Sequence, residues 1–382
     1  MEKINHICFI VPNYPTNEEP VYTFVRQLIC SIADLGIKCS VIAPVSISNI
    51  FISNAKKRKY HWKDITENGN SIDIYQPKMI TFSNVRVFGS SVSSFIRQMT
   101  ILRAFKKLKI KPDVLYGHFW GSGVIVGNLS ERYNIPAFVA TGESKINVHH
   151  KYSQRSIKKH LKKIKGVICV STKNKEESLE LELASKENMT IIPNAINNKL
   201  FFPMDKKQVR KKLGYCEDDF IIAFTGAFSH RKGILRLSEA VEDMKETKVL
   251  YIGAGNLRPN KENALFIGRL PHKQISIYLN AADVFVLPTL AEGCCNAIIE
   301  AMACGLPIIS SNCSFNDDIL FPDNSIRVNS MDIVELREAI LRLREDKKLR
   351  ERMSKASLIH AESLRIEERA SKILSFMNTQ ID

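Results

Sequence analysis

Short apolar runs alternate with amphipathic stretches along most of this 382-residue chain, and no other feature constrains its fold as strongly. A short apolar run is typical of a strand that is buried on both faces, whereas apolar residues spaced three and four apart are typical of a helix. Strands that alternate with helices form parallel sheets, because each helix carries the chain back by a right-handed crossover. The sequence therefore predicts an α/β protein.

The alternation runs in two series, which are separated by a break near residues 194–203. The first series predicts strands in HICFIV, CSVIAP, DVLYGH, AFVAT, GVICVS and MTIIP, and the second in FIIAFTGAF, KVLYIGAG, ALFIG, DVFVLP and LPIIS. After about Ile326 only helical patterns remain. Because a chain of this length exceeds one typical core, we expect two doubly wound, Rossmann-like domains with parallel sheets that face each other across a cleft. They would span residues 1–198 and 199–361, with a C-terminal helix at 362–382 that returns to the first domain.

Composition excludes several classes of protein. The chain is 45% hydrophobic and 25% charged, as ordinary globular domains are. No stretch approaches 18 uninterrupted apolar residues, and INHICFIV stops at Pro12 without the cleavage site of a signal peptide. The nine cysteines lie mostly in apolar runs and lack the spacing of zinc or redox sites. We therefore expect a cytoplasmic protein with reduced thiols and no bound metal.

The stretch AEGCCNAIIEAMACGLP, residues 291–307, contains the strongest candidate site. It follows the predicted strand DVFVLP, so it reads as a loop and then a helix that begins near Asn296 and is closed by Gly305. Ligands of doubly wound sheets bind at this carboxyl end of the strands. Glu292 would project from the loop and Glu300 would lie in the helix. Exposed amides would offer hydrogen bonds to hydroxyl or phosphate oxygens at Gly293, Cys295, Asn296 and Ala297.

A second loop repeats this geometry. The strand FIIAFT ends at Gly226, and a helix opens at Gly233 after the residues AFSHRK. Adjacent Arg231 and Lys232 beside a helix N-terminus suit a diphosphate. The chain contains neither a complete GxGxxG fingerprint nor a GxxxxGK[ST] loop. The pattern therefore indicates a site for a diphosphate nucleotide, without the marks of NAD or ATP.

The motifs, taken in order, resemble the retaining glycosyltransferases of family 4, which have the GT-B architecture of two Rossmann-like domains. The resemblance covers nearly the whole chain. Its most specific part is the pair Glu292 and Glu300, separated by seven residues and followed by AMACGLPII. PDVLYGHF, the RKG after a strand, VSTKNKEES and IIPNAINNKLF also match segments of the family.

The resemblance implies a role for each matching residue. Glu292 would contact hydroxyls of the donor sugar, Glu300 would bind the nucleotide ribose, and the amides after Glu292 would assist them. His118 would lie over the donor sugar. The remaining contacts would come from Gly226, Arg231 and Lys232 at the diphosphate and from Gly268, Arg269 and Leu270 at the base. The implied reaction is retaining sugar transfer from a nucleotide-diphosphate sugar, with no cofactor and no metal, and the chain has no Asp-x-Asp at a strand end.

Charge is divided unevenly between the two halves of the chain. Residues 1–200 contain 29 Lys and Arg against 15 Asp and Glu, whereas residues 201–382 contain 26 against 25. A basic patch with an aromatic anchor lies in AKKRKYHWK and consists of Lys56, Lys57, Arg58, Lys59 and Trp62. KYSQRSIKKHLKKIK adds a second basic cluster on a predicted helix. We expect the first domain to bind the anionic inner face of the cytoplasmic membrane and to take a lipid-linked acceptor of cell-surface polysaccharide synthesis, with no nucleic-acid partner.

Three other interpretations remain open at this point. A nucleotide-sugar 2-epimerase shares the two-domain architecture, although such enzymes do not characteristically carry this spacing of glutamates. A glycosyltransferase with a soluble acceptor would need no membrane patch. A non-catalytic membrane scaffold would have no use for the predicted cation pair beside Glu292.

Overall fold

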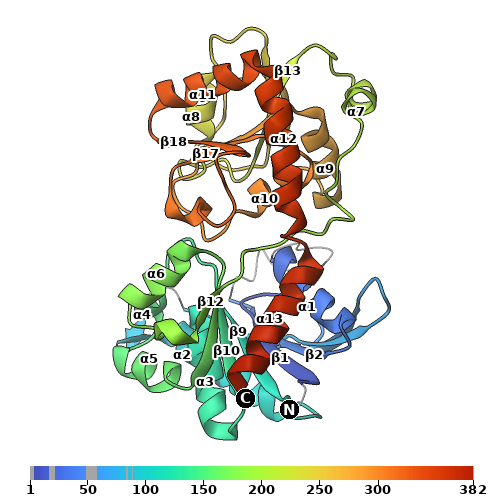
Figure 1. Ribbon diagram of the computed structural model, residues 1–382. Coiled ribbons are helices and arrows are strands. Elements are labelled where there is room, and N and C mark those ends of the chain that lie inside the picture. The colour runs from blue at the N-terminus through green and yellow to red at the C-terminus, as the bar shows by residue number, and fades with distance from the viewer. Residues whose placement is uncertain (1–3, 17–21, 49–57, 83–84, 88, 382) are drawn as a thin grey trace. The chain divides into compact units, whose positions relative to one another are not determined.

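A computed structural model describes residues 4–16, 22–48, 58–82, 85–87 and 89–381 of the chain (Figure 1). Its contacts divide the chain into unit 1, residues 1–192 with 367–382, and unit 2, residues 193–366. The boundaries therefore fall at residues 192 and 366, where the sequence prediction had 198 and 361.

Unit 1 is built on an eight-stranded sheet with the order β12-β11-β10-β9-β1-β2-β5-β4. Each apolar run of the first predicted series forms one of its strands. The strands are β1 His6–Ile10, β2 Lys38–Ile42, β4 His61–Ile65, β5 Ser71–Tyr75, β9 Val114–His118, β10 Ala137–Thr141, β11 Ile164–Cys169 and β12 Met189–Ile191. Two short ladders accompany the sheet and pair β3 Val45–Ser46 with β6 Lys78–Met79, and β7 Arg86–Val87 with β8 Ser90–Ser91.

The sheet of unit 1 is parallel, as predicted, except at one edge. Strand β4 pairs with β5 antiparallel, whereas β5 pairs with β2 parallel. A tight turn joins the two strands, in which the Thr66 amide donates to the Asn70 carbonyl and Gly69 adopts φ 86°. Exposed and half-buried residues alternate along β4, so it carries no apolar run by which a buried strand is recognised.

Helices connect and cover the strands of unit 1. They are α1 Thr23–Asp34, α2 Val92–Lys106, α3 Trp120–Tyr133, α4 Val148–Lys151, α5 Gln154–Leu161, α6 Thr172–Glu180 and a 3-10 turn at Lys186–Asn188. The predicted basic helix is shorter than its pattern suggests, because α5 ends at Leu161 and the inward-facing Ile164 already belongs to β11. The last helix, α13 Ile366–Ile381, lies with unit 1, where the Phe376 ring packs edge-on against Phe138 of β10 (Figure 1).

Unit 2 is built on a six-stranded sheet with the order β15-β14-β13-β16-β17-β18, and all of its recorded pairings are parallel. The strands are β13 Phe220–Thr225, β14 Thr247–Ile252, β15 Ala264–Gly268, β16 Val284–Leu287, β17 Ile308–Ser311 and β18 Ser325–Val328. The sequence analysis missed β18. This edge strand contains Ser325 and Arg327 and so lacks a continuous apolar run.

The helices of unit 2 are α7 Lys206–Leu213, α8 Ile234–Ala240, α9 His272–Ala281, α10 Asn296–Ala303, α11 Ile333–Glu345 and α12 Lys347–Glu362, with a 3-10 turn at Ser314–Asn316. The predicted limits of α10 are confirmed, because the helix begins at Asn296 and Gly305 follows its end with φ 78°. Only a residue without a Cβ adopts this left-handed conformation readily.

Both units are doubly wound, and in each the direction of winding reverses once. In unit 1 the chain proceeds outward from β1 through β2 and β5 on one side, and from β9 through β10 to β12 on the other. In unit 2 the reversal lies between β13 and β16. A crevice opens at the carboxyl ends of the strands at such a point. No helix among the described residues has the length and apolar content needed to span a membrane.

Candidate active site

The two loops predicted to bind the donor meet at the switch point of unit 2. One follows β13 and the other follows β16, and these strands are neighbours in the sheet. The Leu290 amide donates to the Arg231 carbonyl over 2.8 Å, which joins the loops directly. Gly233 permits their close approach, because a Cβ there would lie 2.5 Å from the Pro288 carbonyl oxygen. The contact between these loops therefore fixes the basic pair beside the acidic loop.

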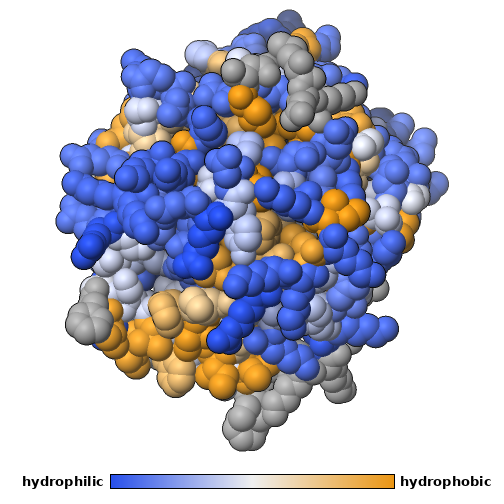
Figure 2. Space-filling view, turned by 90° about the horizontal axis from the view of Figure 1, so that it is seen from below, coloured by the Kyte–Doolittle hydropathy of each residue, from blue (hydrophilic) through white to orange (hydrophobic). Residues whose placement is uncertain are grey.

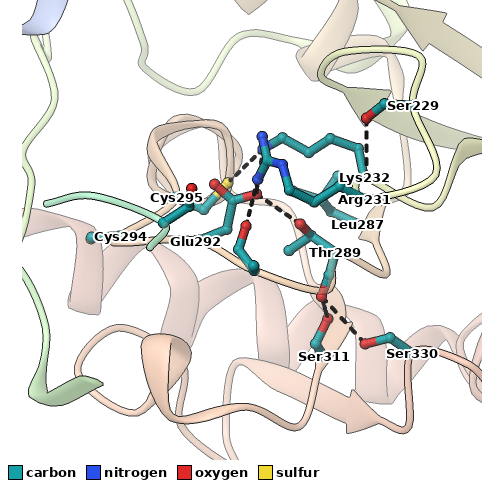
Figure 3. Close-up of polar contacts among 12 residues, drawn as sticks. Ser229, Arg231, Lys232, Leu287, Thr289, Glu292, Cys294, Cys295, Ser311 and Ser330 are labelled. Carbon is teal, nitrogen blue, oxygen red and sulfur yellow. Dashed lines mark hydrogen bonds and ion pairs between the residues drawn. The ribbon is translucent and has the colours of Figure 1, made fainter. Parts of the chain in front are cut away.

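One carboxylate oxygen lies at the centre of this site. Oε1 of Glu292 accepts hydrogen bonds from Arg231 Nη1, Lys232 Nζ and Thr289 Oγ1, each over 2.7 Å (Figure 3). The Arg231 guanidinium also donates to the Ala291 carbonyl. Two cations and one anion therefore share a single cluster.

The loop that carries Glu292 is held firmly from below. The Thr289 carbonyl accepts hydrogen bonds from the hydroxyls of Ser311, at the end of β17, and Ser330, after β18 (Figure 3). Thr289 was not among the predicted site residues. Its hydroxyl gives Glu292 a neutral donor in addition to the two cations, and no motif in the sequence marks that role.

Burial makes the charges of this cluster strong. The side chains of Lys232 and Glu292 are 11% and 12% exposed. Burial alone would lower the pKa of Lys232, but its contacts with Cys295 and Glu292 outweigh burial and raise the pKa overall. Because burial raises the pKa of the Cys295 thiol, the thiol is protonated at neutral pH. Glu292 is then the anion that keeps Lys232 charged.

The N-terminus of α10 adjoins the cluster. Cys295 caps the helix without a side-chain hydrogen bond, and the first amides of any helix lack acceptors within it. The amide groups from Gly293 to Ala297 therefore follow Glu292 directly along the chain into this helix start. Asn194 fixes this helix start, because its Nδ2 donates to Asn296 Oδ1 over 2.8 Å and to the Cys294 carbonyl over 3.1 Å.

Glu300 lies in α10, as predicted, and has a partner that the sequence analysis missed. This partner is His272, the first residue of α9, whose Nε2 lies 2.9 Å from Glu300 Oε1. The hydrogen bond to Glu300 raises the pKa of His272 against the opposing effect of burial. The Phe201 ring packs edge-on against the imidazole at 5.2 Å between centroids. The signal for His272 was weak, because a lone histidine 28 residues before Glu300 belongs to no motif.

Residues predicted for the base and the diphosphate lie at neighbouring strand ends of unit 2. Gly268 ends β15, and its carbonyl accepts from the Gly253 amide at the end of β14. Arg269 is exposed and Leu270 half-buried directly after it. Gly226 follows β13 and touches the stem of Lys232, since a Cβ there would lie 3.4 Å from Lys232 Cδ.

His118 belongs to unit 1 and ends β9, which lies beside β1 at the switch point of that sheet. The ring centroids of Phe119 and Phe24 lie 4.4 Å and 5.6 Å from the centroid of the imidazole. Neither ring nitrogen has a hydrogen-bond partner among the described residues. Burial, aided by the charge of Arg369, lowers the pKa of His118 to about 3. The imidazole is therefore neutral at physiological pH.

The cysteines of the stretch 291–307 are packing residues. Cys294, Cys295 and Cys304 are buried and form no disulfide. Within the described ranges, no three or more His, Cys, Asp or Glu side chains are grouped so as to hold a metal ion. The charged side chains of this stretch are those of Glu292 and Glu300.

The structure describes only part of the predicted membrane patch. Lys56 and Lys57 lie outside the described residues. Lys59 is exposed, and Arg58 Nη1 lies 3.4 Å from Asn13 Oδ1. Trp62 lies in β4, where its indole N–H donates to Gln76 and its ring packs edge-on against Tyr14. Its indole is thus occupied within unit 1.

Two doubly wound units, each with one switch point, are the architecture of the GT-B class. Residues 205–358, within unit 2, match the family model described as "Glycosyl transferases group 1". The chain is 26% identical over 349 residues to a putative teichuronic acid biosynthesis glycosyltransferase of Bacillus subtilis, TuaC, and the match covers 88% of each protein. Unit 2 therefore matches the glycosyltransferases of group 1, and most of the chain is similar to a glycosyltransferase of that kind.

Another relative is similar in sequence, and two solved structures are similar in fold. An Escherichia coli UDP-Gal:alpha-D-GlcNAc-diphosphoundecaprenol alpha-1,3-galactosyltransferase is 27% identical over 290 residues, which cover 67% of this chain and 73% of the relative. Sucrose-phosphate synthase of Thermosynechococcus elongatus superposes with a TM-score of 0.76 at 18% identity, covering 99% of each chain. HepE of Anabaena in complex with UDP superposes with a TM-score of 0.70 at 14% identity, covering 98% of this chain and 100% of HepE. These two structures share the fold of this chain.

Proposed function

We propose that this glycosyltransferase moves a sugar, with retention of anomeric configuration, from a nucleotide-diphosphate sugar to a lipid-linked glycan. We further propose that the product is an intermediate of cell-surface polysaccharide synthesis. The observation that carries the proposal is the joint contact of Arg231 and Lys232 with Glu292 at the switch point of unit 2. A cation pair suits a diphosphate, and a carboxylate beside it suits sugar hydroxyls.

Donor binding would draw on the groups around this cluster. The diphosphate would take Arg231 and Lys232, beside Gly226, together with amides at the N-terminus of α10. Glu300 would accept from the ribose hydroxyls. The strand end formed by Gly268, Arg269 and Leu270 would flank the base. His118 would lie over the donor sugar, where its neutral imidazole accepts or donates one hydrogen bond.

The chemical step follows from where charge develops. Cleavage of the bond between sugar and diphosphate leaves negative charge on the phosphate and positive charge on the sugar ring. Lys232, Arg231 and the amides stabilise the first, at roughly 2–4 kcal/mol for one well-placed donor. Glu292 lies beside the second. We propose that the acceptor attacks the face from which the phosphate departs and that this phosphate receives the acceptor proton, without a metal.

The acceptor is proposed from the relatives and from the charge of unit 1. The E. coli relative acts on a diphosphoundecaprenol-linked sugar, and the B. subtilis relative is assigned to teichuronic acid biosynthesis. The first 200 residues carry nearly all of the net positive charge, which favours an acceptor embedded in an anionic leaflet. Arg58 and Lys59 are described members of that basic surface. We propose a cytoplasmic enzyme that binds the inner face of the membrane peripherally.

Two measurements test the reaction. Thermal shifts with UDP-, GDP- and ADP-sugars should identify the donor, because a ligand at 100 times its Kd adds about 2.7 kcal/mol to stability. Incubation of that donor with a diphosphoprenol-linked sugar should then yield a product with the donor's anomeric configuration by NMR, in the presence of EDTA. Lys232→Ala should lose the thermal shift, whereas Lys248→Ala in β14 is the matched control.

Each alternative has its own outcome. An inverted anomeric configuration would refute retention, and loss of turnover in EDTA would refute metal independence. Conversion of the donor into a different nucleotide sugar without any acceptor would show an epimerase. Transfer to a free saccharide at the same rate as to the lipid-linked sugar would refute the proposal of a lipid-linked acceptor.

A further inference from the structure

Exposed apolar side chains are concentrated in one short part of unit 1. Five of the fifteen large hydrophobic residues that are exposed among the described residues lie between positions 80 and 95. They are 47% to 61% exposed. We call them the apolar edge, and they are Ile80, Phe82, Val85, Val87 and Phe95.

Local pairing holds the apolar edge together as one surface. Strand β7 pairs with β8, and the Val92 amide donates to the Val85 carbonyl over 3.0 Å. The Ser93 hydroxyl contacts both the amide and the carbonyl of Phe82 over 2.7 Å, which fixes Phe82 beside the first turn of α2. Phe95 lies in that same turn. Val85 and Val87 are two positions apart on an extended chain and so point to the same side.

Two segments at the apolar edge carry cations and no carboxylates. Residues 74–112 contain eight Lys and Arg and no Asp or Glu, and residues 144–175 contain ten and none. The two segments meet, because the Ser153 amide donates to Ser90 Oγ over 3.0 Å and Arg86 Nη2 lies 3.5 Å from the His149 carbonyl oxygen. Lys151 and Arg155, on either side of Ser153, are exposed.

An apolar surface flanked by cations from two acid-free segments fits one kind of partner. Figure 2 shows, on the face seen from below, hydrophobic residues gathered along one edge of a surface that is otherwise largely hydrophilic. An anionic bilayer presents phosphates at its surface and hydrocarbon a few ångströms deeper, so cations and apolar side chains are bound at different depths. A protein partner would have to present acidic groups around an apolar centre. Neither of the two segments offers a carboxylate that could pair with cations of such a partner.

We propose that the apolar edge, with Lys151 and Arg155, is the surface by which unit 1 docks on an anionic lipid bilayer. Its side chains enter the interface and the flanking cations bind lipid phosphates. This inference rests on the proposed lipid-linked acceptor only for its purpose, because bilayer binding is measured without donor, acceptor or turnover. It also differs from the patch at residues 55–63, whose tryptophan is occupied within the fold.

Vesicle flotation of the full chain tests the proposal. The probes are vesicles of phosphatidylglycerol with phosphatidylcholine and vesicles of phosphatidylcholine alone. Phe82→Ser with Phe95→Ser should weaken binding to anionic vesicles by on the order of tenfold, at low and high salt alike, because the contribution of apolar burial is not screened. Lys151→Gln with Arg155→Gln should weaken it by about fivefold for each charge, at low salt only.

Matched controls come from unit 2. Val334→Ser with Ile359→Ser removes two apolar side chains that are more exposed than Phe82 and Phe95, and Lys245→Gln with Lys348→Gln removes two exposed cations. Both control variants should bind vesicles as the wild type does. A thermal shift with the nucleotide sugar shows that each variant is folded and that its donor site is intact.

Several results would overturn the proposal. A wild type that ignores both kinds of vesicle would refute it, as would a Phe82 and Phe95 variant that binds as the wild type does. Loss of binding only when Lys56, Lys57, Arg58 and Lys59 are changed to Gln would refute it too. A change in oligomeric state of the phenylalanine variant in sedimentation would indicate a second copy as partner. A raised KM for a lipid-linked acceptor with unchanged vesicle binding would make the edge an acceptor site instead.

Discussion

Removal of His272 should weaken nucleotide binding by way of Glu300. In the structure His272 Nε2 lies 2.9 Å from one oxygen of Glu300, which holds the carboxylate and leaves its other oxygen for the ribose hydroxyls. Hydrogen bonds to charged groups contribute about 1.5–3 kcal/mol. The His272 side chain is 33% exposed, so solvent screens the contact and the lower end applies. His272→Ala should therefore raise the Kd of the nucleoside diphosphate by about tenfold.

The assay compares two ligands, so that positioning is separated from general damage. Isothermal titration is carried out with the nucleoside diphosphate that stabilises the protein and with its 2′,3′-dideoxy analogue. If His272 acts through Glu300 on the ribose, His272→Ala changes the affinity of the first ligand and leaves that of the second unchanged. His360→Ala is the matched control, because His360 makes a similar contact with Asp323 over 3.0 Å elsewhere in unit 2. Equal losses for both ligands would refute this reasoning.

The same pair has a pH signature. The pKa of His272 is raised by the hydrogen bond to Glu300, so its stabilising effect is complete below the ordinary histidine pKa of about 6.5. The effect is lost as the pH rises through the raised pKa. The difference in Tm between wild type and His272→Ala should therefore shrink as the pH is raised from 6 to 9. A difference that stays constant or grows would contradict the assignment of the ion pair.

Three further predictions concern the remaining groups. Glu292→Gln should lower kcat by about 100- to 1,000-fold in steady-state kinetics. It should leave the affinity for the nucleoside diphosphate unchanged or tighter, because Arg231 and Lys232 lose a competing anion. A kcat within threefold of wild type would refute the role of Glu292. Cys294→Ser with Cys295→Ser should retain transfer, and iodoacetamide should not inhibit the wild type, since burial raises the pKa of the Cys295 thiol. Burial lowers the pKa of His118 to about 3, so the wild type should lose unfolding free energy relative to His118→Leu as the pH falls below 6.5. Urea titrations should show a loss of up to about 1.4 kcal/mol per pH unit. Parallel pH profiles of the two proteins would show that His118 is accessible.

Local patterns predicted those parts of the fold that depend on neighbours in sequence. The apolar runs gave the buried parallel strands, and Asn296 and Gly305 gave the limits of α10, because burial and helix termination act within a few residues. Strands β4 and β18 were missed because edge strands need no continuous apolar run. Strand β5 was missed because its buried residues alternate with more exposed ones. The Asn68–Gly69 dipeptide was an available signal for the hairpin between β4 and β5.

The candidate site shows the same division. Spacing alone placed Glu292 in a loop and Arg231 and Lys232 in another, but 60 residues separate them along the chain. Their contact depends on the adjacency of β13 and β16, which is a property of strand order and not of any local motif. The pairing of Glu300 with His272 likewise depends on how α9 packs near α10. Sequence therefore indicated which chemical groups are present, and topology determined which of them touch.

That topology implies an order of binding. Without a donor, Oε1 of Glu292 already accepts hydrogen bonds from Arg231, Lys232 and Thr289, so it is a weak acceptor for a sugar hydroxyl. A diphosphate, with more negative charge than one carboxylate, would draw both cations toward itself and leave Glu292 with unfilled acceptor capacity. Nucleotide binding should therefore strengthen sugar binding, with a coupling on the order of tenfold.

This coupling is measurable without any acceptor. Titration of the free monosaccharide that corresponds to the donor should give weak binding to the protein alone and about tenfold tighter binding when the nucleoside diphosphate is saturating. Thermodynamic reciprocity requires the monosaccharide to tighten the nucleotide by the same factor. In Glu292→Gln the coupling should vanish, because the neutral amide no longer alternates between the cations and the sugar. Monosaccharide affinity that is equal with and without nucleotide in the wild type would mean that Arg231 and Lys232 remain on Glu292 when the diphosphate is bound.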